Sequence, residues 1–189
     1  MPPKVRFTRE NIVAAATDVV RAAGMPALTA RALSEKLNSS VAPVFSVFEN
    51  MEEVRGAVVA EAKKIYKSYI AEGLKNPLPF KGAGLKYIEF ARREPNLFKV
   101  LFMSENRVNI DDFMLLDENN AEIIGALVNS WSLDIKTARE LHNNIMLFTH
   151  GIAVLCACGS CNFSDEEISG RLTFAFTAML KQIKGAGND

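Results

Sequence analysis

Hydrophobic residues recur at intervals of three and four along nearly the whole chain, which is the spacing that places them on one side of an α-helix. The first such segment runs from about Arg9 to Ala23. Thr8 is expected to cap its start, and Gly24 is expected to follow its end. No Asn-Gly or Asp-Gly turn between alternating segments points to a β-hairpin. The pattern therefore predicts an all-α protein.

Two short helices joined by a tight turn are predicted next. Thr29 is expected to cap a helix that ends before Asn38, a residue type that tolerates the left-handed conformation of a tight turn. Ser40 is then expected to cap a third helix that ends near Phe48. Pro43 falls in the first turn of that helix, where the missing backbone N–H is tolerated.

Longer helices are predicted over the rest of the chain. Asn50 and Glu53 have capping-box spacing at the start of a fourth helix. Its predicted inner face comprises Val54, Val58, Ala62, Ile65 and Tyr69. Beyond the Asn-Pro-Leu-Pro stretch at 76–79, five further helices are predicted, over residues 81–93, 96–104, 118–131, 134–157 and 164–185. The expected fold therefore has about nine helices.

The inner face predicted for the helix over residues 134–157 comprises Ile135, Ala138, Leu141, Ile145, Phe148, Ile152 and Leu155. The last helix begins with a second capping box, which Ser164 and Glu167 form. Together these helices predict a bundle that follows the compact N-terminal unit. The expected domains are residues 1–53 and 54–189.

The three N-terminal helices have the order of a helix-turn-helix unit. Such a unit presents its third helix, here residues 40–48, to the major groove of DNA, while its second helix crosses the phosphate backbone. An α-helix fits the width of that groove, and exposed side chains at its N-terminal end reach base edges.

At these residues the chain resembles the TetR family of helix-turn-helix transcriptional regulators. The resemblance is closest between Thr8 and Val54, in the motifs Thr8-Arg9-Glu10-x-Ile12-x-x-Ala15-Ala16, Thr29-x-Arg31-x-Leu33-Ser34-Glu35 and Ser40-x-x-x-Val44-Phe45-x-x-Phe48. In the C-terminal part, Glu94-Pro95-x-Leu97-Phe98 and Thr149-His150-Gly151-Ile152-Ala153 are similar to one subgroup's sensor domain. The resemblance implies a ligand-responsive regulator, expected to be a repressor. It would bind a near-palindromic operator as a homodimer and release it when an effector binds.

Three residues depart from the family's pattern. Asn38 stands where the family has a turn glycine, Phe45 where it has a phosphate-binding tyrosine, and Met51 where it has a lysine. Two phosphate donors are therefore missing, and the predicted recognition helix carries no charge. Its hydroxyls would reach base edges, and its small apolar side chains would touch thymine methyl groups.

Basic residues outnumber acidic ones between Met1 and Phe48, which partly compensates for the uncharged helix. Contacts of these cations with phosphates would make the affinity for DNA fall as salt rises. The residues predicted to contact double-stranded DNA are Lys4, Arg6, Arg9, Thr29, Arg31, Lys36, Ser39, Ser40, Val41, Ala42, Pro43, Phe45 and Ser46.

The resemblance also implies that the last two helices pair with their copies in a second chain. That dimer would hold two recognition helices about 34 Å apart, one turn of B-form DNA. Bulky side chains in the remaining helices could line a pocket for an unidentified small-molecule effector, although most of them are also compatible with an ordinary core. The candidate ligand-binding residues are Phe90, Phe98, Phe102, Met103, Trp131, Met146 and His150.

Composition narrows the alternatives. The chain has 22 basic and 22 acidic residues, so net charge does not indicate a nucleic-acid partner. No apolar segment is long enough for a transmembrane helix, and the N-terminus lacks the apolar region of a signal peptide. An odd number of cysteines, three, fits a reducing cytoplasm. Cys158 and Cys161 could converge on a metal with His150, but buried or idle thiols fit as well, and no metal or cofactor is expected.

No catalytic motif is present: the chain has no Gly-rich phosphate loop, Gly-x-Ser-x-Gly or His-Glu-x-x-His sequence. A non-enzymatic protein is therefore expected. The alternative to a DNA-binding regulator is a dimeric helical module that has lost DNA binding and acts through protein contacts. Its support is the uncharged recognition helix together with Phe45 and Met51.

Overall fold

The computed structural model describes residues 7–103 and 120–185 of the chain. Within these ranges the chain forms nine α-helices, one 3-10 turn and no strand, which confirms the predicted all-α fold of about nine helices. None of the helices in the described ranges is long and apolar enough to cross a membrane.

The described chain divides into two compact units. The first comprises residues 7–65 and 94–103, and the second comprises residues 66–93 and 120–185. The division falls between residues 65 and 66, inside the long helix α4 (Met51–Gly73), whereas the sequence predicts it after residue 53, near the start of the same helix. Residues 94–103 belong with the N-terminal helices, so the first unit is discontinuous in sequence.

The first unit contains α1 (Arg9–Ala23), the 3-10 turn η1 (Met25–Ala27), α2 (Ala30–Lys36), α3 (Ala42–Phe45), the first part of α4, and α6 (Pro95–Phe102). Thr8 caps α1 in a capping box with Asn11. Gly24 ends the helix at a φ of 80°, a conformation that favours glycine. The predicted bounds and caps of α1 are therefore confirmed.

Helix α6 packs against α1 through buried and polar contacts. Leu97 and Phe98 of α6 are completely buried. At its start, Glu94 accepts a hydrogen bond from Arg21 Nε at 2.9 Å, and the Asn96 side-chain amide donates to the Arg21 carbonyl at 2.8 Å. The hydrogen bond with Glu94 raises the pKa of the Arg21 guanidinium.

Helix α3 is shorter than the sequence predicts. It begins at Ala42 and ends at Phe45, and Val41, which precedes it, makes no side-chain capping bond. The prediction that Ser40 caps this helix is wrong. An N-cap hydroxyl accepts from the second or third residue of the helix, and the third residue after Ser40 is Pro43, which has no N–H to donate. Turns continue to Phe48, whose N–H donates to the Val44 carbonyl at 3.0 Å.

The inner face of α4 follows one spacing of four throughout. Val54, Val58 and Ala62 are buried as predicted, but the next buried residues are Tyr66 and Ile70. The predicted Ile65 and Tyr69 are only half-buried. In the second unit, Tyr66 packs edge-on against Tyr87, with ring centroids 5.9 Å apart.

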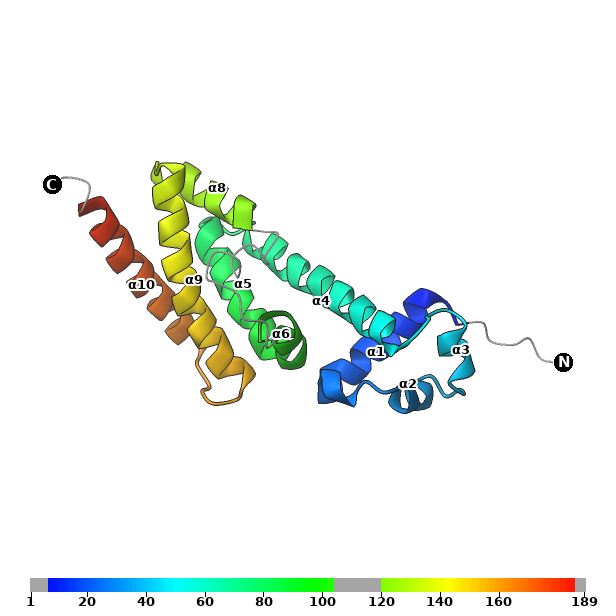
Figure 1. Ribbon diagram of the computed structural model, residues 1–189. Helices are drawn as coiled ribbons and strands as arrows, with labels where there is room; N and C mark the ends of the chain where they lie inside the picture. The colour runs from blue at the N-terminus through cyan, green and yellow to red at the C-terminus, as the bar shows by residue number, and fades with distance from the viewer. Residues whose placement is uncertain (1–6, 104–119, 186–189) are drawn as a thin grey trace. The chain divides into compact units, whose positions relative to one another are not determined.

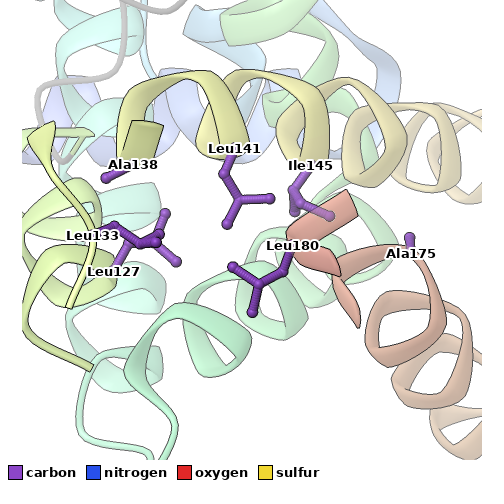
Figure 2. Close-up of a cluster of buried hydrophobic side chains, with 7 residues drawn as sticks. All are labelled: Leu127, Leu133, Ala138, Leu141, Ile145, Ala175 and Leu180. Carbon is purple, nitrogen blue, oxygen red and sulfur yellow. The ribbon is translucent and has the colours of Figure 1, made fainter. Parts of the chain in front are cut away.

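The second unit contains the end of α4, α5 (Pro79–Arg93), α8 (Asn120–Trp131), α9 (Ile135–Ala157) and α10 (Asp165–Gly185). Helix α9 packs against both α5 and α10 (Figure 1). Side chains from α8, α9, α10 and the turn after α8 converge in one hydrophobic cluster (Figure 2), which comprises Leu127, Leu133, Ala138, Leu141, Ile145, Ala175 and Leu180.

Capping residues define where the two C-terminal helices begin. The Asp134 carboxylate accepts from the N–H groups of Lys136 and Thr137, both at 3.0 Å. Ser164 and Glu167 form the predicted capping box at the start of α10. The predicted inner face of α9 is confirmed from Ala138 to Ile145 and at Ile152. Its two end members, Ile135 and Leu155, are exposed.

Helices α4 and α5 lie very close to each other at two glycines. A Cβ atom added to Gly73 would lie 2.6 Å from the Gly82 carbonyl oxygen, and one added to Gly82 would lie 2.5 Å from Cβ of Asn76. Real Cβ atoms do not come this close to backbone atoms, so neither position has room for a side chain. The crossing fixes where the first turn of α5 lies relative to the end of α4.

Candidate functional site

A tight turn joins α2 to α3 in the first unit. Asn38 occupies the left-handed region, with a φ of 48°, as the sequence predicts. The Ser39 N–H donates to the Ser34 carbonyl at 3.0 Å and closes the turn. Leu33 before the turn and Val44 and Phe48 after it are buried, so these three side chains anchor the two helices to the rest of the unit.

Anchoring by Val44 and Phe48 leaves the opposite face of α3 in solvent. Val41 is 41% exposed and Phe45 is 43% exposed. Ser40, Ala42 and Ser46 are also exposed, whereas Ser39 and Pro43 are half-buried. The structure therefore leaves five of the seven uncharged residues predicted in this segment exposed to solvent. The Ser46 hydroxyl donates to the Pro43 carbonyl at 2.7 Å, which holds it in place.

Each described basic residue of the predicted DNA-binding set has an acidic partner in its own unit. Lys4 and Arg6 lie outside the described residues. The remaining three form ion pairs, Arg9 with Glu53 at 2.8 Å, Lys36 with Asp18 at 3.1 Å, and Arg31 with Glu35 at 2.9 Å. The Arg9 guanidinium also lies over the Phe48 ring, 4.3 Å from its centre.

These partners limit how freely the cations could meet another anion. The hydrogen bond with Glu35 raises the pKa of the Arg31 guanidinium. The pKa of Glu53 is lowered, first by the hydrogen bond from the Glu49 backbone N–H and then by that from Arg9. The Thr29 hydroxyl accepts the Ala32 N–H at 3.1 Å, so it caps α2 as predicted.

The second unit contains a cavity of about 220 Å³. It is lined by residues from the end of α4 and from α5, α8, α9 and α10. Its surface is mainly apolar, as is usual for a site that binds a small molecule.

One wall of this cavity is a continuous series of rings from four helices. Trp131 lies 5.2 Å from Phe176, Phe176 lies 5.4 Å from Phe80, and Phe80 lies 6.0 Å from His142, measured between ring centroids. These distances are typical of tilted and edge-to-face aromatic pairs. His142 is buried, and its Nε2 shares a hydrogen bond with the Asn120 side-chain oxygen at 2.9 Å.

Two of the seven predicted ligand-binding residues, Trp131 and Met146, line this cavity. His150 does not line it but shares a hydrogen bond with the hydroxyl of Tyr87, which does, at 2.8 Å. Burial lowers the pKa of His150, which favours its neutral form. Phe90 is completely buried, and its ring packs against Tyr66.

Phe98, Phe102 and Met103 belong to the first unit and do not line the cavity of the second. The rings of Phe98 and Phe102 lie 5.2 Å apart. Conversely, sequence reasoning did not select Phe80, Phe176 or His142 as ligand-binding residues. Each lies on a helix face that also carries core residues, and the sequence alone does not separate the two roles.

The three cysteines carry free thiols. Cys156 and Cys161 are half-buried, and Cys158 is exposed. Burial raises the pKa of the Cys156 thiol, which makes its reactive thiolate form scarcer. Among the described residues, no three Cys, His, Asp or Glu side chains are grouped as metal ligands would be.

Large apolar side chains are exposed on α9 and α10. Leu147 and Leu155 lie eight residues apart on α9, with the exposed Gly151 midway between them, so they share one face. Phe174 on α10 is 77% exposed. These are the two helices predicted to pair with a second copy of the chain.

No family model and no curated protein matches the chain.

Proposed function

We propose that this protein is a ligand-responsive transcriptional regulator that binds a near-palindromic DNA site as a homodimer. The observation that carries the proposal is the surface of α3. Val44 and Phe48 anchor the segment, and Val41, Phe45 and Ser46 are presented to solvent directly after the turn at Asn38. This is the arrangement that a helix-turn-helix unit needs to insert its third helix, here α3, into the major groove.

The proposed dimer forms through the exposed apolar face of α9 and α10. A fully buried phenylalanine contributes on the order of 1.5–3 kcal/mol relative to an exposed one, so exposure of Phe174 is unfavourable in a monomer. A two-fold axis at this face would bring two copies of the first unit, each with its own α3, into one dimer.

The proposed response to a ligand runs through α4. Val54 and Val58 of this helix are buried in the first unit, and Ile70 near its end lines the cavity of the second. A ligand alters DNA affinity only if it binds one arrangement of the dimer better than another. A single helix shared by both units is the element through which such a preference would pass.

The test is a titration of the full-length protein onto labelled DNA from the promoter region of its own gene, at several salt concentrations and with DNA of scrambled sequence as competitor. Specific binding that weakens with salt supports the regulator. Ser46→Glu should abolish that binding because it places a negative charge beside phosphates. Ser160→Glu, at an exposed position in the second unit, is the matched control and should leave it unchanged. Unchanged binding by Ser46→Glu would show that α3 does not enter the groove.

The dimer has its own test. Phe174→Asp should convert the protein to a monomer in light-scattering measurements, because two carboxylates would be buried at the interface. A wild-type protein that is monomeric at all concentrations used would contradict this part of the proposal.

A second candidate function is a helical module that acts through protein contacts without binding DNA. It is favoured by the ion pairs of Arg9, Arg31 and Lys36, which occupy the cations expected to meet phosphates. The same titration separates the two candidates. Dimerisation without any sequence-specific DNA binding, at low as well as high salt, supports the interaction module.

A further inference from the structure

We propose that the cavity of the second unit binds a small aromatic carboxylate, with one planar ring, one carboxylate group and about ten non-hydrogen atoms in total. This names the chemical class of the effector. Its regulatory meaning rests on the proposed function, but binding itself does not.

Size sets the first limit. A dry cavity of about 150 Å³ lined by Leu, Ile and Phe accommodates benzene, which has about six non-hydrogen atoms. The cavity here, at about 220 Å³, is about half as large again. It therefore has room for one ring with a short substituent.

The shape and polarisability of the aromatic wall set the second limit on the ligand. Trp131, Phe176 and Phe80 line the cavity as a series of mutually tilted rings. Aromatic pairs in these arrangements are more favourable than their buried area alone provides. A planar aromatic ligand extends the series, whereas a saturated ring of equal size does not.

Positive charge at the cavity wall sets the third limit on the ligand. The first turn of α5 contributes Pro79, Phe80 and Lys81 to the wall, so the positive end of a 15-residue helix faces this region. Lys81 is half-buried and adds a full positive charge. The described lining contains no Asp or Glu. Lys81 forms no ion pair with any residue in the ranges 7–103 and 120–185.

An anion is therefore stabilised at this wall, and a cation is repelled. In a partly desolvated site these effects are larger than in water, because the effective dielectric constant is lower. An apolar ring joined to one carboxylate satisfies both the aromatic wall and Lys81.

Trp131 makes the test direct. It is the single tryptophan of the chain, so tryptophan fluorescence, excited selectively over tyrosine, reports on this wall of the cavity. The full-length protein is titrated with phenylacetate, cyclohexylacetate and phenethylamine. The first two differ in aromaticity, and the first and third differ in charge. Phenylacetate should give a saturable change with a dissociation constant on the order of 10–100 µM. The other two should bind at least about tenfold more weakly.

Three variants assign the contacts. Lys81→Gln should weaken phenylacetate binding about tenfold and leave phenethylamine binding no weaker, because only the charge is removed. Phe176→Leu should reduce the preference for phenylacetate over cyclohexylacetate. Phe163→Leu changes the same residue type in the same unit, at a half-buried position that does not line the cavity, and it should leave both affinities unchanged. Thermal melts of each variant check that the fold is retained.

The outcomes separate this inference from the proposed function. Absence of a saturable change with phenylacetate, or equal binding of phenethylamine, overturns the assignment of the ligand class even if the protein binds its promoter. Equal affinity for cyclohexylacetate, unaffected by Phe176→Leu, overturns the aromatic requirement. Phenylacetate binding that depends on Lys81 supports the inference even if no DNA binding is detected, in which case the proposed function fails alone.

Discussion

The glycine pair where α4 crosses α5 yields the most sharply defined stability prediction. Gly82→Ala should destabilise the protein, although alanine normally stabilises a helix interior by about 1 kcal/mol relative to glycine. The added methyl group would lie 2.5 Å from Cβ of Asn76 and 3.0 Å from the carbonyl carbon of Gly73. Because the contacts include backbone, no flexible side chain can move away, and the two helices must separate.

Overpacking of this kind costs about 1–3 kcal/mol or more, which exceeds the gain in helix propensity. Gly56→Ala is the matched control, since it lies in α4 with nothing within 4 Å of the added methyl group. For a chain of this size, 1 kcal/mol corresponds to roughly 2–4 °C in Tm. Calorimetry should therefore show a higher Tm for Gly56→Ala and a Tm lower by several degrees for Gly82→Ala. A rise in Tm for Gly82→Ala would refute the close approach.

The remaining predictions concern charge, base contacts and pH. Glu35→Gln should release Arg31 from its ion pair, so the affinity for DNA should rise in fluorescence anisotropy titrations. The slope of log K against log salt concentration should steepen by about 0.9. An unchanged slope would mean that Arg31 contacts no phosphate. Replacing the thymine opposite Val41 by uracil should weaken DNA binding about fourfold for each methyl group that is contacted, since burying one methyl group contributes about 0.8 kcal/mol. An unchanged affinity would argue against that contact. The pKa of Asp134 is lowered, chiefly by the hydrogen bond from the Thr137 hydroxyl. The contribution of Asp134 to the stability of the folded protein is therefore complete above the ordinary carboxyl pKa range, and it is lost as pH falls through the folded-state pKa. Asp134→Asn should accordingly flatten the acid side of the Tm–pH profile, and a profile identical to that of the wild type would contradict the cap.

The elements that could be predicted from the sequence are those whose signals are local. Thr8, Ser164 and Glu167 cap their helices as expected, because each bond joins residues three apart and depends on little else. Asn38 adopts the positive φ that its side chain tolerates. The error at Ser40 is also local, since the proline three residues later removes one of the two backbone donors that could reach such a cap.

Features that depend on distant partners were harder to predict. Beyond Ala62, α4 has apolar residues in two adjacent registers, and the buried one is selected by packing of Tyr66 on rings of α5. The residues that line the cavity were hard to predict for the same reason. Trp131 and Met146 were selected for their bulk, but so was Phe98, which lies in the other unit. Nothing in the local pattern reveals that α6 belongs with the N-terminal helices.

The return of α6 to the first unit has a consequence during protein synthesis. When the ribosome has produced the chain up to residue 65, the surface of α1 against which Leu97 and Phe98 pack still has no cover. About forty more residues must emerge before it does, which takes roughly 2–8 s at about 5–20 residues per second. Until then the nascent helices present an apolar surface to chaperones. A fragment truncated within α4 would keep that surface exposed permanently and should aggregate.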